Sequence, residues 1–199
     1  DPNSGGRQMP QHFGCKELNI VSQSSPTGTQ YLQATGAAFA LQRDKNNGVV
    51  YVSSGEGTTS QGDFHEALNW ASRTKAPVIF HVENNGYAIS VPIEDQTAGG
   101  SVYKISAGYE NLDRIQIDGT DYFESLLAFN KAVDRARKGH GPTVIESIVV
   151  RLLPHSSSDD HRKYRSEEEL EQDEKNDPIL KFRDLCIDGK IMTEKEFVK

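Results

Sequence analysis

The sequence has few cysteines, no long apolar run and no excess of basic charge. Only two cysteines occur among the 199 residues, and neither Cys15 nor Cys186 has the spacing of a CxxC motif or of a Cys/His metal site. We therefore expect reduced thiols in a reducing compartment. Because the stretch contains no run of about 18 apolar residues and no charged-then-apolar leader, we expect no membrane span and no signal peptide within it.

Acidic residues outnumber basic ones, 29 against 22, and the formal net charge is -7. Since no basic stripe is present, nucleic-acid binding is not expected. The hydrophobic content of 35% is enough for one sizeable core, so we expect residues 1–199 to form a single domain. The chain begins with DPNSGG rather than Met, and its first 26 residues are polar without periodicity. We therefore expect a fragment that lacks upstream and downstream segments.

Two apolar runs on either side of one helical pattern form the centre of the sequence. Residues 49–52 (VVYV) are short, β-branched and aromatic, and the polar stretch 53–55 follows them; residues 78–82 (VIFHV) share this character. Both patterns predict buried strands. Between them, apolar residues recur at i, i+4 and i+7 from Phe64, which predicts an amphipathic helix capped by Asp63. The order strand, helix, strand predicts a βαβ unit.

The two loops that follow these strands carry oxygen-rich side chains. A βαβ crossover returns the chain parallel to its start, so residues 55–57 (GEG) and 83–86 (ENNG) should meet at the carboxyl edge of the sheet. The Glu56 carboxylate and an Asn amide oxygen are hard donors suited to Mg²⁺, which shares its octahedron with phosphate oxygens. Each loop alone is also typical of an ordinary turn. Together, at this spacing, they predict a magnesium diphosphate site.

Further helices and strands alternate on both sides of this unit. The patterns predict a helix opening near Pro26 and running to about residue 45, a strand at 114–117, a helix at 122–138 and a strand at 143–150. Proline suits the first turn of a helix. The alternation predicts an α/β fold with a doubly wound, mostly parallel sheet. On helix 122–138 we expect one core-facing side, made of Phe123, Leu126, Leu127, Asn130 and Val133.

A polar loop at residues 151–160 follows the last predicted strand and should also reach the ligand edge. It carries His155, a residue type that can donate to a diphosphate and move protons near neutral pH, although a loop histidine is also typical of a solvated surface. Ser166 and Glu169 have the spacing of a capping box, which predicts a helix over 166–175. We expect charged residues at the end of the loop and just after it to pair with one another and fold the loop onto itself. These residues are Asp159, Asp160, Arg162, Lys163 and Arg165.

Four strings in this sequence resemble known enzymes. GEG followed about thirty residues later by NN resembles the thiamine-diphosphate motif of thiamine-dependent enzymes. The strings EALNWAS, NNGYAIS and HSSSDDHRKYR resemble the α subunit of branched-chain 2-oxo acid dehydrogenase, or 2-oxoisovalerate dehydrogenase, and the similarity runs from about Gly6 to the end. The resemblance implies a thiamine-diphosphate-binding fold and oxidative decarboxylation of branched-chain 2-oxo acids, with acyl transfer to the lipoyl-lysine of a transacylase partner.

The resemblance also implies which residues bind the cofactors. The side chains of Glu56 and Asn85 and the backbone carbonyl of Tyr87 would hold Mg²⁺, which clamps the diphosphate. Glu83 stands where some relatives carry an arginine that grips the diphosphate, so one anion contact is missing. The residues expected to bind thiamine diphosphate are Ser25, Thr27, Gly55, Glu56, Gly57, Thr58, Asn85, Tyr87 and His155.

Residues 24–30 (SSPTGTQ) resemble the string SSPLATQ of the same family, which forms a potassium site. Carried over, the resemblance implies K⁺ binding by Ser24, Pro26, Thr29 and Gln30. Thr27 departs from the usual leucine. By themselves these residue types are equally typical of a capped helix start.

The family further implies a catalytic role for His155 in acyl transfer and phosphorylation of Ser156 in mitochondrial relatives. It implies a β subunit, or a fused β half, that supplies the acid needed at the aminopyrimidine ring. We therefore expect an α₂β₂ heterotetramer and no activity from this chain alone. The location would be cytoplasmic in a bacterium and the mitochondrial matrix in a eukaryote.

Two alternatives remain open from the sequence. A pyruvate or acetoin dehydrogenase α subunit shares the same metal motif, although that branch more often reads NNxYGMGT where this chain has NNGYAIS. A non-catalytic assembly subunit would keep the fold without the cofactor. Intact Glu56, Asn85 and His155 favour an enzyme.

Overall fold

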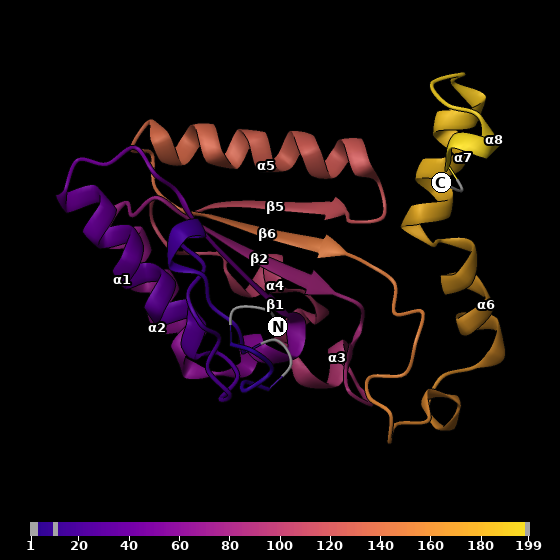
Figure 1. Ribbon diagram of the computed structural model, residues 1–199. Coiled ribbons are helices and arrows are strands. Elements are labelled where there is room, and N and C mark those ends of the chain that lie inside the picture. Colours follow the sequence, from indigo (N-terminus) through magenta and orange to yellow (C-terminus); the bar gives the residue numbers. More distant parts are fainter. Residues whose placement is uncertain (1–3, 10–11, 198–199) are drawn as a thin grey trace.

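Four parallel strands form the sheet at the centre of the computed structural model, which describes residues 4–9 and 12–197 (Figure 1). The strand order is β1-β2-β6-β5, and all three pairings are parallel. The predicted α/β fold with a doubly wound, mostly parallel sheet is therefore confirmed. The strands are β1 (Val50–Gly55), β2 (Val78–Asn84), β5 (Asp113–Asp118) and β6 (Thr143–Ile148).

Helices cover both faces of this sheet. Helices α1 and α2 lie on one face and α5 on the other, while α6, α7 and α8 stand beyond the carboxyl ends of the strands (Figure 1). In the described part of the chain, no helix combines the length and apolar character needed to cross a membrane. The α-helices are α1 (Thr29–Arg43), α2 (Gly62–Thr74), α3 (Ile93–Gln96), α4 (Val102–Ile105), α5 (Tyr122–Arg137), α6 (Glu167–Lys175), α7 (Pro178–Asp188) and α8 (Glu194–Phe197). The short elements are η1 (Lys16–Leu18), η2 (Glu56–Ser60), η3 (Ala98–Gly100), η4 (His161–Lys163), β3 (Tyr87–Ala88) and β4 (Val91–Pro92).

The core lies on both sides of β2, because successive side chains of a strand point to opposite faces. Phe80 and Val82 belong to the cluster on the α1/α2 face, together with Phe64 and Leu68 of α2. Ile79 turns to the other face and packs in the cluster that α5 covers. A strand buried on both faces explains why residues 78–82 are apolar without alternation.

Strands β1 and β2 are longer than the sequence predicts. The polar residues 53–55, expected to follow the first strand, belong to β1 because they pair in register with residues 81–83 of β2. Likewise β2 continues to Asn84, which pairs with Ile148 of β6. The ladder hydrogen bonds of neighbouring strands thus override local turn propensity. As a result, the two loops at the carboxyl edge begin at Glu56 and at Asn85.

Two predicted helix starts are wrong. The N-cap of α2 is Gln61, and Asp63 lies within the first turn. Helix α1 begins at Thr29 rather than near Pro26, because Gly28 occupies the N-cap with φ +98°. Glycine adopts this left-handed conformation without steric cost, so the helix begins three residues after the proline.

The buried face of α5 also differs from the expected one. Phe123, Leu126 and Leu127 are 46%, 42% and 69% exposed, so these three residues of the predicted core side lie at the surface. Val133 is partly buried and packs against the core cluster, as predicted. The buried residues of α5 are Ala128, Ala132 and Ala136. Their spacing of four places small side chains on one face, which lets the helix lie close to the sheet.

Candidate functional site

Glu56 is the first residue after β1, at the carboxyl edge of the sheet. Parallel pairing places Gly55 opposite Glu83, so the chain leaves β1 beside the end of β2. The Glu56 side chain is buried, at 1% exposure, and its Oε2 accepts a hydrogen bond from the backbone N–H of Asn85 at 3.2 Å. The predicted meeting of the two loops is confirmed.

The second carboxylate oxygen of Glu56 has no protein partner. Within the described residues, Oε1 is buried and accepts no hydrogen bond. Burial raises the pKa of Glu56, although the backbone N–H groups of Glu56 and Asn85 and the charge of Arg151 act in the opposite direction. A buried, half-paired carboxylate is costly unless a cation or donor completes it. The site therefore favours a cation at this oxygen.

The turn after β2 is fixed by hydrogen bonds within it. Asn84 Oδ1 accepts from the Gly86 N–H at 2.9 Å, and Asn85 Oδ1 accepts from the Tyr87 N–H at 3.2 Å. Gly86 has φ +84°, a conformation that glycine adopts readily. The turn thus holds Asn85 against Glu56 and passes at once into β3, which begins at Tyr87. Among the described residues, no three His, Cys, Asp or Glu side chains form a metal-binding group; the predicted set contains one carboxylate and two neutral oxygens.

Gly57 lies in close contact with the loop that follows β2. A Cβ atom at Gly57 would lie only 2.8 Å from Cβ of Ala88, so the two loops approach through a glycine. Gln96 of α3, which no sequence pattern indicated, stabilises the turn at Gly57 through hydrogen bonds. Its Nε2 donates to the carbonyl oxygens of Glu56 and Gly57 at 3.3 and 3.1 Å and to Ser60 Oγ at 2.8 Å. No local pattern marks such a long-range contact.

The segment before α1 lies against η2. A Cβ atom at Gly28 would be 2.8 Å from Cβ of Gln61 and 3.8 Å from Cγ2 of Thr58. Gly28 thus brings this segment to the turn that begins at Glu56. The predicted cofactor residues 25 and 27 belong to the segment, and both are exposed. Ser25 Oγ is also hydrogen bonded to Nε2 of His12 at 3.0 Å.

Three of the four predicted potassium ligands come together in this segment. The hydroxyl groups of Ser24 and Thr29 are hydrogen bonded, and Thr29 Oγ1 donates to the Pro26 carbonyl at 3.1 Å. The Gln30 Oε1 accepts from the Gly28 N–H of the same segment at 3.0 Å. The oxygen atoms of Ser24, Pro26 and Thr29 are suited to a monovalent cation.

His155 lies in the exposed segment after β6. Its backbone N–H donates to Asp159 Oδ2 at 2.9 Å, and Tyr164 donates its hydroxyl to the same oxygen at 2.7 Å. The hydrogen bond from Tyr164 is the main reason that the pKa of Asp159 is lowered. Asp159 therefore fixes the backbone at His155. In the described part of the chain, no hydrogen bond joins the His155 imidazole to Glu56 or Asn85.

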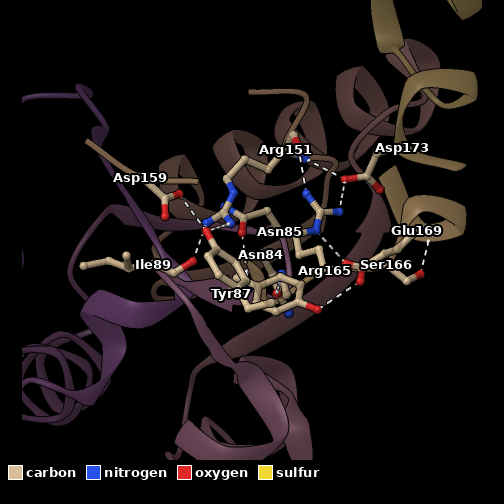
Figure 2. Close-up of polar contacts among 12 residues, drawn as sticks. Asn84, Asn85, Tyr87, Ile89, Arg151, Asp159, Arg165, Ser166, Glu169 and Asp173 are labelled. Carbon is tan, nitrogen blue, oxygen red and sulfur yellow. Dashed lines mark hydrogen bonds and ion pairs between the residues drawn. The ribbon is translucent and has the colours of Figure 1, made fainter. Parts of the chain in front are cut away.

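Arg151 connects this segment to the chain that follows the turn after β2. Its Nη1 donates to the Ile89 carbonyl and its Nη2 to the Tyr164 hydroxyl, each at 2.8 Å. The guanidinium carbon also lies 5.6 Å from the centroid of the Tyr87 ring. Figure 2 shows the guanidinium between the turn after β2 and Asp159. The arginine thus ties the His155 segment to the loop that carries Asn85.

Arg165 anchors the same region to α6. Its side chain is 1% exposed and pairs with Glu169 at 2.8 Å and Asp173 at 2.5 Å, while Tyr87 donates its hydroxyl to Glu169 at 3.1 Å (Figure 2). The expectation that Arg165 pairs within its own loop is wrong, since α6 supplies both carboxylates. Asp160 does pair locally, with Arg162 at 2.8 Å.

The capping box at the start of α6 forms only in part. Ser166 Oγ accepts from the Glu169 N–H at 3.2 Å, as predicted. The Glu169 carboxylate turns instead to Arg165 and Tyr87. The ion pair with Arg165 and the hydrogen bond from Tyr87 take the place of the return bond to Ser166.

Solved structures of similar fold support this description of the sheet. An X-ray structure from Mycobacterium smegmatis, assigned to the thiamin diphosphate-dependent enzymes, matches with a TM-score of 0.50 and 24% identity over 66% of this chain and 24% of that chain. At this identity the match supports the fold alone.

Curated relatives are considerably more similar in sequence. The chain is 48% identical over 183 residues to 2-oxoisovalerate dehydrogenase subunit alpha of Bacillus subtilis, covering 92% of this chain and 55% of that protein. It is 42% identical over 188 residues to the mitochondrial 2-oxoisovalerate dehydrogenase subunit alpha of Mus musculus, covering 94% of this chain and 42% of that protein. It is 41% identical over 172 residues to 3-methyl-2-oxobutanoate dehydrogenase subunit alpha of Mycobacterium tuberculosis, covering 86% of this chain and 47% of that protein. The chain thus spans about half the length of the curated relatives it matches.

A family model covers the whole chain. The model described as the dehydrogenase E1 component matches residues 1–199, which include the Glu56 loop, the Asn85 turn and the segment that carries His155. This chain belongs to the dehydrogenase E1 component family.

Proposed function

We propose that this chain is the cofactor-binding part of the α subunit of 2-oxoisovalerate dehydrogenase. The enzyme would decarboxylate branched-chain 2-oxo acids oxidatively and pass the acyl group to the lipoyl-lysine of a transacylase partner. The observation that carries the proposal is the buried Glu56 carboxylate, which meets Asn85 through one oxygen and leaves the other without a protein partner. The names of the relatives support the choice of substrate.

In this proposal Mg²⁺ is held by the side chains of Glu56 and Asn85 and by the Tyr87 carbonyl. Carboxylate and carbonyl oxygens are the ligands that Mg²⁺ prefers, and the ion shares its remaining positions with water and substrate phosphates. The unpartnered Glu56 Oε1 and the raised pKa that burial causes fit such an ion. Cation binding would keep the carboxylate ionised.

Thiamine diphosphate, when bound, supplies the nucleophilic carbon and the electron sink for decarboxylation. The chain itself would bind and orient. Gly55, Gly57 and Thr58 are chain neighbours of Glu56, and their backbone and hydroxyl donors suit a diphosphate. Ser25 and Thr27 lie in the neighbouring segment before α1, and the oxygen atoms of Ser24, Pro26 and Thr29, with Gln30 next to them, would hold K⁺ and stiffen that segment.

His155 is proposed as the residue that contacts the diphosphate and moves a proton during acyl transfer. The network of Arg151, Asp159 and Tyr164 supports this role, because it fixes the backbone of an otherwise exposed segment. A phosphate on neighbouring Ser156 would add about two negative charges beside the diphosphate and inhibit binding. The β subunit, or a fused β half, would complete the active site in an α₂β₂ assembly. In a eukaryote the location would be the mitochondrial matrix, and in a bacterium the cytoplasm.

The test is calorimetric titration of thiamine diphosphate with Mg²⁺ into the full-length protein and its β partner. Wild type should bind, Glu56→Ala should not, and Glu66→Ala on the exposed side of α2 should bind as wild type does. Turnover of 3-methyl-2-oxobutanoate but not pyruvate by the complete complex would establish the substrate. Absence of binding to wild type would instead favour a non-catalytic assembly subunit.

A further inference from the structure

A second buried glutamate is hydrogen bonded to Asn84, the last residue of β2. Glu146 is in the middle of β6, opposite Val82 of β2 and Gln116 of β5, and it is 0% exposed. The sequence pattern of the predicted strand at 143–150 did not indicate a role for this glutamate. A carboxylate in the centre of a parallel sheet is costly unless hydrogen bonds satisfy it.

Hydrogen-bond donors surround the Glu146 carboxylate. Five of them lie at 2.8 to 2.9 Å. Burial by itself raises the pKa of Glu146, but the backbone N–H groups of Tyr103 and Val102 and the side chains of Ser101 and Asn84 outweigh it, so the pKa is lowered. The group is an anion. The donors are Asn84 Nδ2 and Val102 N to Oε1, and Ser101 Oγ, Tyr103 N and Gln116 Nε2 to Oε2.

One of these donors belongs to the turn that faces Glu56. Because Asn84 Nδ2 donates to Glu146, the amide is held in one orientation and its Oδ1 accepts from the Gly86 N–H. This bond closes the turn around Asn85, whose own N–H donates to Glu56. Three hydrogen bonds in sequence therefore connect Glu146 to the candidate metal ligand. An acceptor-only group is required at Glu146, since a donor there would favour the opposite amide orientation.

We propose that Glu146 is a positioning residue for the divalent-metal site, acting by fixing the Asn84 amide and hence the turn that holds Asn85 opposite Glu56. The inference rests on the proposed function, since it assumes that Glu56 and Asn85 hold a metal. Glu146 itself touches neither the metal nor the substrate. Groups that orient metal ligands typically change metal affinity by 10- to 100-fold when they are replaced.

The test measures Mn²⁺ affinity by electron paramagnetic resonance in the full-length protein with its β partner and saturating thiamine diphosphate. Glu146→Gln keeps the shape but replaces one acceptor oxygen by a donor, and it should weaken Mn²⁺ binding by about tenfold or more. Asn84→Ala should do the same. The double variant should bind no more weakly than the weaker single variant, because both act through one contact.

Ser101→Ala is the matched control. It also removes a donor to Glu146 but leaves the Asn84 bond in place, so it should lower the melting temperature while Mn²⁺ affinity stays within about twofold. Glu146→Gln with wild-type Mn²⁺ affinity, or additive losses in the double variant, would overturn the proposal. If Glu146→Gln does not fold, Asn84→Ala decides, and wild-type affinity there overturns it. Failure of the wild type to bind Mn²⁺ would refute the proposed function itself, a different result from loss in the variants alone.

Discussion

The backbone N–H of Asn85 donates a hydrogen bond to Glu56 Oε2 at 3.2 Å, although the two residues are 29 positions apart. The contact exists because β1 and β2 are parallel neighbours whose carboxyl ends lie at the same edge of the sheet. It leaves Glu56 Oε1 buried and without a partner among the described residues. A cation placed at that oxygen would be held by two loops at once.

The approach of these two loops should be sensitive to the size of residue 57. Gly57→Ala would place a Cβ 2.8 Å from Cβ of Ala88, and such overpacking costs about 1–3 kcal/mol. We expect a lower free energy of unfolding in urea and weaker binding of Mg²⁺ with thiamine diphosphate, measured by calorimetry. The control is Gly62→Ala, where nothing lies within 4 Å. Equal behaviour of the two variants would contradict close packing at Gly57.

The potassium site can be tested without the divalent metal. If Ser24, Pro26 and Thr29 hold K⁺, then K⁺ at 100 times its dissociation constant should stabilise the protein by about 2.7 kcal/mol. Thr29→Val removes a hydroxyl that contacts both Ser24 and the Pro26 carbonyl, and it should abolish the shift in melting temperature. Na⁺ at the same ionic strength is the control; an identical shift with Na⁺ would show only a general salt effect.

His81 should make stability depend on pH. It lies between Tyr51 and Ser147, hydrogen bonded to each at 2.8 Å, and burial lowers its pKa from 6.5 to about 4. Glu83 lies 3.8 Å away but is 54% exposed, against 12% for His81, so burial prevails and the imidazole is neutral.

Because the unfolded chain binds a proton at His81 below pH 6.5 and the folded chain does not until about pH 4, stability should fall over that interval as pH drops. We expect His81→Asn to remove about 1–3 kcal/mol of this loss, measured by urea unfolding at pH 7, 5.5 and 4.5. His140→Asn, at an exposed position, should leave the slope unchanged. A wild-type slope in His81→Asn would refute the assignment.

Arg165 should be the strongest single anchor of α6. Replacing it with Met would leave Glu169 and Asp173 without their buried partner, and truncating one member of such a pair costs about 2–5 kcal/mol. Because the anchor is local, hydrogen exchange should rise over residues 151–175 more than in the sheet. Lys175→Met is the control, since its pair with Glu171 is 69% exposed on both sides and surface pairs contribute little.

The sequence by itself determined the order of strands and helices and the edge at which the functional loops meet. Hydrophobic periodicity gives the elements, and the geometry of a parallel βαβ unit brings Glu56 to Asn85 whatever the side chains around them do. The sequence did not determine the strand ends. Turn-forming residues at 53–55 predicted that the first strand ends before them, but pairing with β2 extends the strand to residue 55.

Only the tertiary structure decided which residues support that site. Glu146 and Gln96 reach their partners from distant elements, and no local pattern encodes contacts of this kind. The buried face of α5 followed the same rule, because close approach to the sheet selected alanines such as Ala132 over the leucines nearby. Sequence periodicity indicates whether a segment is a helix or a strand, whereas long-range packing and buried hydrogen bonds determine which of its side chains form the core and support the site.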